Sequence, residues 1–284
     1  MKLLLLDETY PAGELRGFDV VKTPQEDVVA LLTRSEISVG EDLFAELPSL
    51  RVIGTASAGF DHIDVEAAER RGVVVVTAAG YANDEVADHT LALLYGLVRR
   101  VVDLDRSVVR GEWDAKAAGP LGTLAGMRVG IVGLGRIGNA VATRLLALGA
   151  EVWANDVLPV ARDGVRVVDL PELLAKCDAV TLHVPLTPET RGLIGRSEID
   201  AMKAGAFLVN TSRGPVVDLD AVVAALHKGR LGGAGLDVLP QEPPAAPPSA
   251  PNLIVTPHAA YYSPASEERS YSFCIARVRE VLGA

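Results

Sequence analysis

The sequence has little cysteine: Cys177 and Cys274 are the only two among 284 residues. They lie far apart and outside any CxxC motif or cysteine–histidine cluster, so neither a disulfide framework nor a zinc site is expected. Both are predicted to be small buried hydrophobic residues. The pattern fits a reduced cytoplasm, and it predicts no bound metal.

A long apolar run is also missing, although 49% of the residues are hydrophobic. The opening segment from Met1 to Asp7 has four leucines before an acid, which is too short for a signal-peptide core or a membrane span. We therefore interpret this segment as a first strand and expect no membrane partner.

Positive charge is in deficit, with 27 lysines and arginines against 37 aspartates and glutamates and a net charge of −10. A chain with this balance has no general attraction to nucleic acid or to an anionic membrane surface. Small molecules are the expected partners, and nucleic acid is not.

Strand-like runs alternate with helical segments along the whole chain, which predicts an α/β architecture with parallel sheets. A chain of 284 residues is long enough to divide into two domains. The strands are expected at residues 3–6, 28–32, 51–54 and 73–76, and then at 129–132, 151–154, 179–184, 206–210, 232–236 and 253–256.

The connections between these strands include two unusual segments. A helical pattern without proline from Asp84 to about Val109 predicts one long connecting helix. Only five residues, Thr23 to Asp27, separate the segment 19–22 from the next strand, which is too few for a parallel crossover. The layout of this edge stays open, and a terminal helix is expected from Ser266 to Leu282.

The most informative segment is VGIVGLGRIG, residues 129–138, in which a GxGxxG pattern lies between a strand and a helix. Gly133 permits a tight turn, Gly135 lets the backbone approach a pyrophosphate, and Gly138 lets the helix pack closely on the strand. The phosphates would then meet a helix N-terminus. The segment predicts a dinucleotide site.

A second strand places Asp156 where its carboxylate suits a ribose 2′-hydroxyl. An acid at this position repels the extra phosphate of NADP, so NAD is the favoured cofactor. Arg162 and Arg166 lie close enough in sequence to fold back, and they leave the strict preference open.

Polar residues follow three later strands, where open parallel sheets bind their ligands. Arg213 follows one strand, Glu242 lies beyond the next, and His258 closes the last. Together they supply a fixed cation, an acid and a titratable base.

At these residues the sequence resembles the D-2-hydroxyacid dehydrogenase family, through VGIVGLGRIG, HVPLTPET, NTSRGPVVD, GLDVLPQEPP and TPH in order. The likeness spans nearly the whole chain. It implies two doubly wound parallel-sheet domains: a Rossmann NAD-binding domain, residues 94–259, inserted into a smaller flavodoxin-like substrate domain, residues 1–93 and 260–284. It also implies a homodimer that interconverts a 2-oxo acid and a D-2-hydroxy acid.

The resemblance implies that Arg213, Glu242 and His258 are catalytic, and the chemistry suits them. Reduction of a 2-oxo acid develops negative charge on the carbonyl oxygen, so a proton donor such as His258 must stand beside it. Glu242 against the second ring nitrogen would orient His258 and favour its protonated form. Arg213 offers a planar fork for the substrate carboxylate and carbonyl.

The remaining site residues are implied by the resemblance. Backbone amides of the loop Ser57, Ala58 and Gly59 are expected to bind the substrate carboxylate, whereas His62, His89 and His227 are interpreted as structural. The expected cofactor-binding set is Gly133, Gly135, Arg136, Ile137, Gly138, Asp156, His183, Val184, Pro185, Thr190, Thr211, Ser212, Arg213, Asp237 and His258.

Some features depart from the family or leave the function open. Only Tyr10 to Arg16 follow the first strand where the family has a full helix, so the first domain is trimmed, which makes a partner-binding groove there less expected. After His258 the chain reads AAYYS, which resembles the C-terminal-binding proteins. An NAD(H)-responsive, corepressor-like binding protein is therefore the alternative function. The substrate is not predicted: Phe60, Tyr261 and Tyr262 form either an aromatic wall or part of the core.

Overall fold

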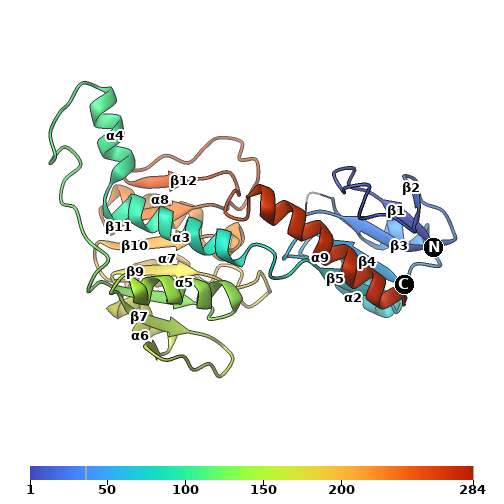
Figure 1. The fold of residues 1–284 in the computed structure, drawn as a ribbon. Helices are drawn as coiled ribbons and strands as arrows, with labels where there is room; N and C mark the ends of the chain where they lie inside the picture. Colours follow the sequence, from blue (N-terminus) through green and yellow to red (C-terminus); the bar gives the residue numbers. More distant parts are fainter. Residues whose placement is uncertain (36, 284) are drawn as a thin grey trace. The chain divides into compact units, whose positions relative to one another are not determined.

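The computed structural model describes residues 1–35 and 37–283. The chain folds into two compact units, Met1–Ala82 with Tyr262–Ala284, and Asn83–Tyr261 (Figure 1). Each unit is built on one parallel sheet covered by helices, so the predicted fold class is confirmed. The division at Ala82 assigns the whole helix that begins at Asn83 to the second unit, whereas the sequence placed the domain boundary inside that helix.

The first unit contains a five-stranded sheet in the order β2-β1-β3-β4-β5, with every neighbouring pair parallel. One hydrophobic cluster around Phe44 and Ile53 lies on one face of it. The elements of this unit are β1 (Lys2–Leu5), β2 (Asp19–Val21), β3 (Val28–Thr33), α1 (Glu41–Ala45), β4 (Val52–Thr55), α2 (Val65–Arg70), β5 (Val74–Thr77) and α9 (Pro264–Leu282).

The segment that the sequence left without a place forms β2, an edge strand parallel to β1. The expectation that five residues are too few for a parallel crossover is wrong here. β2 is only three residues long, so the chain has a short distance to cover from its end back to the start of β3. Because extended chain covers about 3.4 Å per residue, a short loop is long enough. The described segment between β1 and β2 forms turns without a helix, as a trimmed front predicts.

The terminal helix α9 packs on β4 and β5 (Figure 1). Gly54 makes the close approach possible, because a Cβ there would lie 2.7 Å from both the Cys274 sulfur and a methyl of Val278. The helix begins two residues earlier than predicted, at Pro264, because the Ser263 side chain caps the N–H of Ser266.

The second unit contains a seven-stranded parallel sheet in the order β12-β11-β10-β9-β6-β7-β8. The chain runs outward from β6 in one direction and then from β9 in the other, which creates a switch point between these two strands. Its elements are α3 (Asn83–Val98), α4 (Val101–Val109), β6 (Arg128–Val132), α5 (Arg136–Ala147), β7 (Glu151–Asn155), β8 (Val165–Val167), α6 (Leu170–Lys176), β9 (Ala179–Leu182), α7 (Arg196–Ala201), β10 (Ala206–Asn210), the 3-10 turn η1 (Gly214–Val216), α8 (Leu219–His227), β11 (Leu231–Leu236) and β12 (Leu253–Val255).

Helices cover both faces of this sheet. One hydrophobic cluster joins α3 and α5 to the strands, and a second joins α6, α7 and α8 to the opposite face. None of the helices in the described ranges has the length and apolar character needed to cross a membrane.

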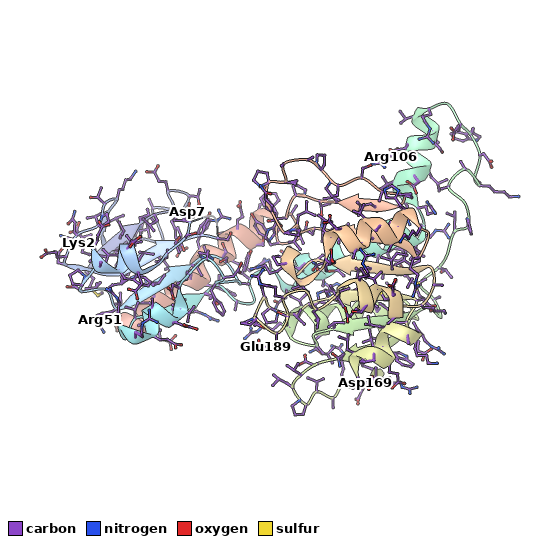
Figure 2. The ribbon with its side chains drawn as sticks, turned by 180° about the vertical axis from the view of Figure 1, so that it is seen from behind. Lys2, Asp7, Arg51, Arg106, Asp169 and Glu189 are labelled. Atoms are coloured by element: carbon purple, nitrogen blue, oxygen red, sulfur yellow. The ribbon has the colours of Figure 1, made fainter. Side chains whose placement is uncertain are left out.

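The predicted single helix from Asp84 to Val109 is wrong, because the chain breaks between α3 and α4. Arg100 has a left-handed backbone with φ 51°, and its guanidinium donates to Asp103 at 2.9 Å in the first turn of α4. α3 buries one face against the sheet, whereas in α4 only Ser107 is fully buried. Figure 2 labels Arg106, an exposed residue of α4.

Candidate active site

The glycine-rich loop joins β6 to α5 at the switch point of the second sheet. Gly133 is left-handed with φ 91°, and a Cβ there would lie 2.6 Å from the carbonyl oxygen of His183. A Cβ on Gly138 would overlap the carbonyl of Gly133. By contrast, apart from its neighbours in the chain, a Cβ built on Gly135 has no atom of the described residues within 4 Å. The middle glycine therefore leaves the N-terminus of α5 open to a pyrophosphate, with Arg136 and Ile137 in its first turn.

Asp156 lies at the end of β7 and is tied to the glycine loop. One carboxylate oxygen accepts the N–H of Leu134 at 2.7 Å and the other accepts the N–H of Leu158 at 2.9 Å. The two arginines that the sequence left open have other partners: Arg162 donates to Asn139 on α5, and Arg166 lies over the ring of Trp153. The end of β7 therefore carries an acid, and the two arginines are engaged elsewhere.

The end of β9 supplies the other wall of the glycine loop. Burial lowers the pKa of His183 to about 3, so the ring is neutral near pH 7. Nε2 lies 3.1 Å from the Thr181 hydroxyl, and buried Nδ1 has no hydrogen-bond partner among the described residues. Val184 and Pro185 continue this wall, and the hydroxyl of Thr190 donates back to the Pro185 carbonyl at 2.6 Å. A buried ring nitrogen without a hydrogen-bond partner beside the glycine loop is consistent with a bound dinucleotide that would supply the partner.

Arg213 follows β10, in a turn that is fixed by its neighbours. The Asn210 side chain donates to the Arg213 carbonyl at 2.9 Å and accepts the N–H and hydroxyl of Ser212. The hydroxyl of Thr211 lies 2.9 Å from that of Thr90 on α3. The Arg213 guanidinium donates to the Ser212 carbonyl at 2.9 Å. These contacts fix the backbone from which the cation projects.

Glu242 and His258 form a short hydrogen-bonded pair. His258 Nδ1 lies 2.7 Å from one oxygen of Glu242, and the other oxygen accepts the N–H of Leu239 at 2.8 Å. Burial acts to raise the pKa of Glu242, but the hydrogen bonds from His258 and Leu239 and the charges of His258 and Arg213 outweigh it, so the pKa is lowered. Glu242 is therefore ionised over the physiological range, and its contact occupies Nδ1 of His258.

Asp237 follows β11, and only 1% of it is exposed. Its carboxylate accepts the Thr256 hydroxyl at 2.6 Å and the N–H groups of Ala259 and Ala260 at 2.8 and 3.0 Å. The structure therefore places Asp237 directly under the turn that carries His258. Its expected part in cofactor binding stays a prediction.

The loop expected to bind the substrate carboxylate follows β4 in the first unit. The Ser57 hydroxyl donates to the Gly59 carbonyl at 2.7 Å and lies 2.8 Å from the Thr55 hydroxyl, which also meets His62 at 3.2 Å. Ala58 at the tip is exposed. These contacts hold the loop in one conformation.

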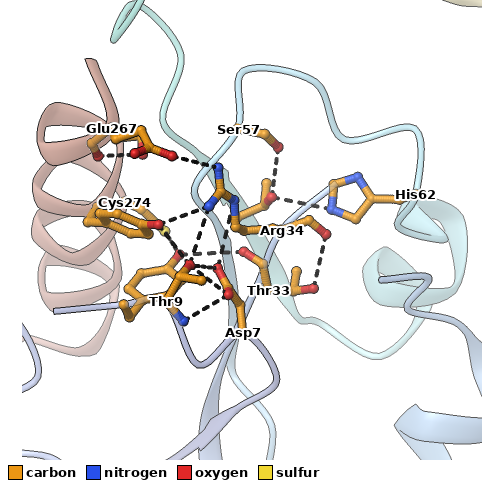
Figure 3. Close-up of polar contacts among 12 residues, drawn as sticks. Asp7, Thr9, Thr33, Arg34, Ser57, His62, Glu267 and Cys274 are labelled. Carbon is orange, nitrogen blue, oxygen red and sulfur yellow. Dashed lines mark hydrogen bonds and ion pairs between the residues drawn. The ribbon is translucent and has the colours of Figure 1, made fainter. Parts of the chain in front are cut away.

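A charged cluster stands beside this loop at the end of β3 (Figure 3). Because Thr33 pairs with Thr55 in register, Arg34 follows its strand at the level where the loop begins. The Arg34 guanidinium lies 3.8 Å from Asp7 and 3.7 Å from Glu267, and it donates to the Tyr271 hydroxyl at 2.9 Å. Two acids thus compensate one cation at this edge.

Sequence reasoning missed several residues that build the site. A Cβ on Gly214 would overlap the backbone of Leu239, so this glycine brings the segment before Glu242 against the turn after β10. Thr256 was noted only as part of the strand end before His258, and His89, interpreted as structural, lies 3.0 Å from its hydroxyl. The glycine directly after Arg213 was the one available indication of such a crossing.

Comparison with known proteins places this geometry in a family. The NAD-binding domain of the D-isomer-specific 2-hydroxyacid dehydrogenases matches residues 91–260. A glycerate dehydrogenase of Methylorubrum extorquens is 40% identical over 266 residues, which cover 88% of this chain and 83% of that protein. The chain belongs to the D-isomer-specific 2-hydroxyacid dehydrogenase family.

Other members agree with this assignment. A glyoxylate reductase of Thermofilum pendens is 39% identical over 249 residues, 82% of this chain and 72% of that protein. The crystal structure of D-lactate dehydrogenase from Aquifex aeolicus, complexed with NAD and lactic acid, superposes with a TM-score of 0.88 and 30% identity, covering 100% of this chain and 96% of that one. The chain spans 45% of the D-3-phosphoglycerate dehydrogenase of Archaeoglobus fulgidus that it also matches.

Family membership confirms the predicted reaction class and cofactor. The protein is an NAD-dependent oxidoreductase that interconverts 2-oxo acids and 2-hydroxy acids. The relatives named above are dehydrogenases and reductases, which supports the enzyme over the corepressor-like alternative. As a D-2-hydroxyacid dehydrogenase, it requires a proton donor, a carboxylate-binding cation and a nicotinamide-binding face.

Proposed function

We propose that His258 is the acid–base catalyst of a D-specific 2-oxoacid reductase, with Glu242 orienting it and Arg213 binding the substrate carboxylate and carbonyl. The 2.7 Å contact between His258 Nδ1 and Glu242 carries this proposal. A carboxylate with a lowered pKa on Nδ1 holds the proton there, so Nε2 is the atom that gives a proton in reduction and takes one in oxidation.

NAD supplies the hydride exchange when it is bound. The residues that would hold it lie around the glycine loop and the ends of β7, β9, β10, β11 and β12. Asp156 selects the unphosphorylated ribose, and the neutral His183 offers Nδ1 to a polar group. The proposed cofactor-binding set is Gly133, Gly135, Arg136, Ile137, Gly138, Asp156, His183, Val184, Pro185, Thr190, Thr211, Ser212, Arg213, Asp237 and His258.

Arg213 acts as a fixed cation during the reaction. Its planar guanidinium grips a carboxylate with two parallel hydrogen bonds and polarises the neighbouring carbonyl as negative charge develops there. In the first unit, the backbone of Ser57, Ala58 and Gly59 contributes further carboxylate-binding amides. The held Ser57 hydroxyl supports this role, because it fixes the loop without any incoming ligand.

The substrate is a small 2-oxo acid without a phosphate. Arg34 is the cation next to the carboxylate loop, and its charge is compensated by Asp7 and Glu267. A phosphate dianion placed there would meet two carboxylates as well as one guanidinium, which is unfavourable. Phe60 and Tyr262 are 48% and 58% exposed, so they are not core residues and leave apolar surface for an uncharged side chain.

Turnover of a substrate panel tests the catalytic assignment. NADH oxidation is followed with glyoxylate, hydroxypyruvate, pyruvate and branched or aromatic 2-oxo acids, in the parent enzyme and in His258→Ala and Arg213→Ala. Loss of general acid catalysis is expected to lower kcat of His258→Ala by about a hundredfold or more. Arg213→Ala should raise KM as well, and NADH titration of both variants separates a loss of turnover from a loss of cofactor binding. An active His258→Ala enzyme would refute the proposal.

Phosphorylated and unphosphorylated hydroxypyruvate test the substrate class. The parent is expected to prefer the unphosphorylated acid, and Glu267→Gln is expected to shift the ratio of the two kcat/KM values toward the phosphorylated one. Glu8→Gln removes the same charge at an exposed acid paired with Lys22 and should leave the ratio unchanged. A parent enzyme that prefers the phosphorylated acid would contradict the assignment.

The proposal extends to assembly and location. The protein is a homodimer formed through the second unit, supported by the exposed apolar side chains of Val101, Val109 and Trp113, which are 55%, 81% and 91% exposed. Location in the cytoplasm is supported by two free, buried cysteines.

A further inference from the structure

His258 stands on a strained backbone that its surroundings must hold. Its φ of 52° lies in the left-handed region, which non-glycine residues adopt at a cost of about 1 kcal/mol or more. The His258 N–H donates to the backbone carbonyls of Asp237 at 2.8 Å and Thr256 at 3.0 Å. The imidazole of His258 therefore keeps its orientation only while the backbone of this turn is held in place.

The buried carboxylate of Asp237 fixes the turn on both sides of His258. Before it, the Thr256 hydroxyl donates to Asp237 at 2.6 Å. After it, the N–H groups of Ala259 and Ala260 donate to the two carboxylate oxygens at 2.8 and 3.0 Å. Together with its carbonyl, which accepts the N–H of His258, Asp237 contacts four of the five residues in the segment 256–260.

His89 completes this arrangement from helix α3. Its Nε2 lies 3.0 Å from the Thr256 hydroxyl oxygen and 3.5 Å from Asp237. Because the single hydroxyl proton of Thr256 is given to Asp237, the Thr256 oxygen must accept from His89, so Nε2 carries the proton. His89 therefore anchors the strand end to a helix whose other face is buried in the core of the unit.

We infer that His89, Thr256 and Asp237 form a clamp that positions His258 for proton transfer. His89 and Thr256 are positioning residues that act through the turn. This inference rests on the proposed role of His258. The contacts of Asp237, Thr256 and His89 with the turn support it. It does not depend on whether Asp237 also contacts the cofactor, because Thr256 and His89 can be substituted without changing Asp237.

Thr256→Val tests the clamp, since it keeps the shape of the side chain and removes its hydroxyl. A small misalignment of a reacting group lowers rate by about ten- to a hundredfold, so kcat is expected to fall by that factor. KM for the 2-oxo acid and the Kd of NADH should stay unchanged. Thr256→Ser restores the hydroxyl and should restore kcat. Ser107→Ala serves as the control, because it removes another buried hydroxyl of this unit, one that donates to the Leu104 carbonyl within α4. It should leave kcat unchanged.

A double-mutant cycle decides whether His89 acts through Thr256. His89→Ala should lower kcat, and the double variant should lose no more than Thr256→Val alone, because both remove one connected path. If the fold-losses in kcat of the two single variants multiply in the double variant, the clamp is overturned. A Thr256→Val enzyme with parental kcat, or one in which NADH affinity falls in parallel with kcat, would overturn it as well.

An independent spectroscopic readout separates this inference from the proposed catalysis. The His258 Nδ1 proton, hydrogen-bonded to Glu242, is followed by NMR in the parent, Thr256→Val and Ser107→Ala proteins. A shifted or exchange-broadened resonance in Thr256→Val alone supports the clamp even where His258→Ala stays active and the proposed acid–base role fails. An unchanged resonance in all three refutes it.

Discussion

His183 shows how one side chain couples folding to pH. Burial lowers its pKa to about 3, whereas in an unfolded chain a histidine titrates near a pKa of about 6.5. Between these values the unfolded state binds a proton that the native state does not. The free energy of unfolding therefore falls as pH drops through this window, by up to about 1.4 kcal/mol per pH unit from this residue.

Replacement of His183 is expected to flatten that dependence. Urea unfolding of parent and His183→Gln protein at pH 7 and pH 5 should show a smaller loss of stability in the variant. His227→Gln, at an exposed histidine near the end of α8, should keep the parental loss. An equal loss in all three proteins would show that His183 is protonated in the native state.

The sequence was sufficient for some residues of the site and not for others. Glu242 and His258 follow neighbouring parallel strands, whose carboxyl ends meet at one edge, so their approach could be predicted. His89 and Thr256 are 167 residues apart, and their contact depends on how α3 lies on the sheet. No local pattern encodes that packing, which is why His89 was interpreted as structural.

At the scale of elements, the strand–loop–helix unit of β6 and α5 separates two uses of glycine. A Cβ on Gly138 meets the carbonyl of Gly133, and one on Gly135 meets open space. Gly138→Ala is therefore expected to destabilise the fold by about 1–3 kcal/mol, as overpacking does. Gly135→Ala should keep the parental melting temperature and weaken NADH binding.

Thermal melting with and without NADH, together with NADH titration, distinguishes the two variants. Gly149 follows the C-cap of α5 at a left-handed position, where an added Cβ would be in ordinary contact with Ala125, so Gly149→Ala controls for an added Cβ outside the cofactor loop. If Gly135→Ala bound NADH as tightly as the parent, the pyrophosphate would not lie over this glycine.

Elements with strong periodicity could be predicted, and those set by backbone irregularity could not. Apart from β2 and β8, the strands of both sheets agree with the sequence analysis. The break between α3 and α4 depends on the left-handed Arg100, a conformation that the residue type does not favour. β8 was missed because Val165–Val167 is too short to show an alternating pattern.

At the scale of the whole molecule, the proposed dimer depends on the outer face of α4 and the chain after it. Val109→Asp combined with Trp113→Ser places a charge and a small polar group at two positions that are 81% and 91% exposed. Light scattering after size exclusion should give the mass of one 29.9 kDa chain for this variant and twice that for the parent.

Melting temperature and a matched surface change complete this test. A solvent-facing substitution should leave the second unit folded, so circular dichroism is expected to match the parent. Val74→Asp, at a 45% exposed valine in the first unit, should remain a dimer. A Val109→Asp and Trp113→Ser protein that keeps the parental mass would exclude α4 from the interface.

The chain order of the two units has a consequence for biosynthesis. Residues 83–261 are inserted between the strands of the first unit and the helix α9 that covers β4. During translation the inserted unit is complete before α9 leaves the ribosome, although domains usually fold in N-to-C order. The apolar face of the first sheet around Gly54 therefore stays uncovered until α9 has been synthesised, and a chaperone would be needed during this interval.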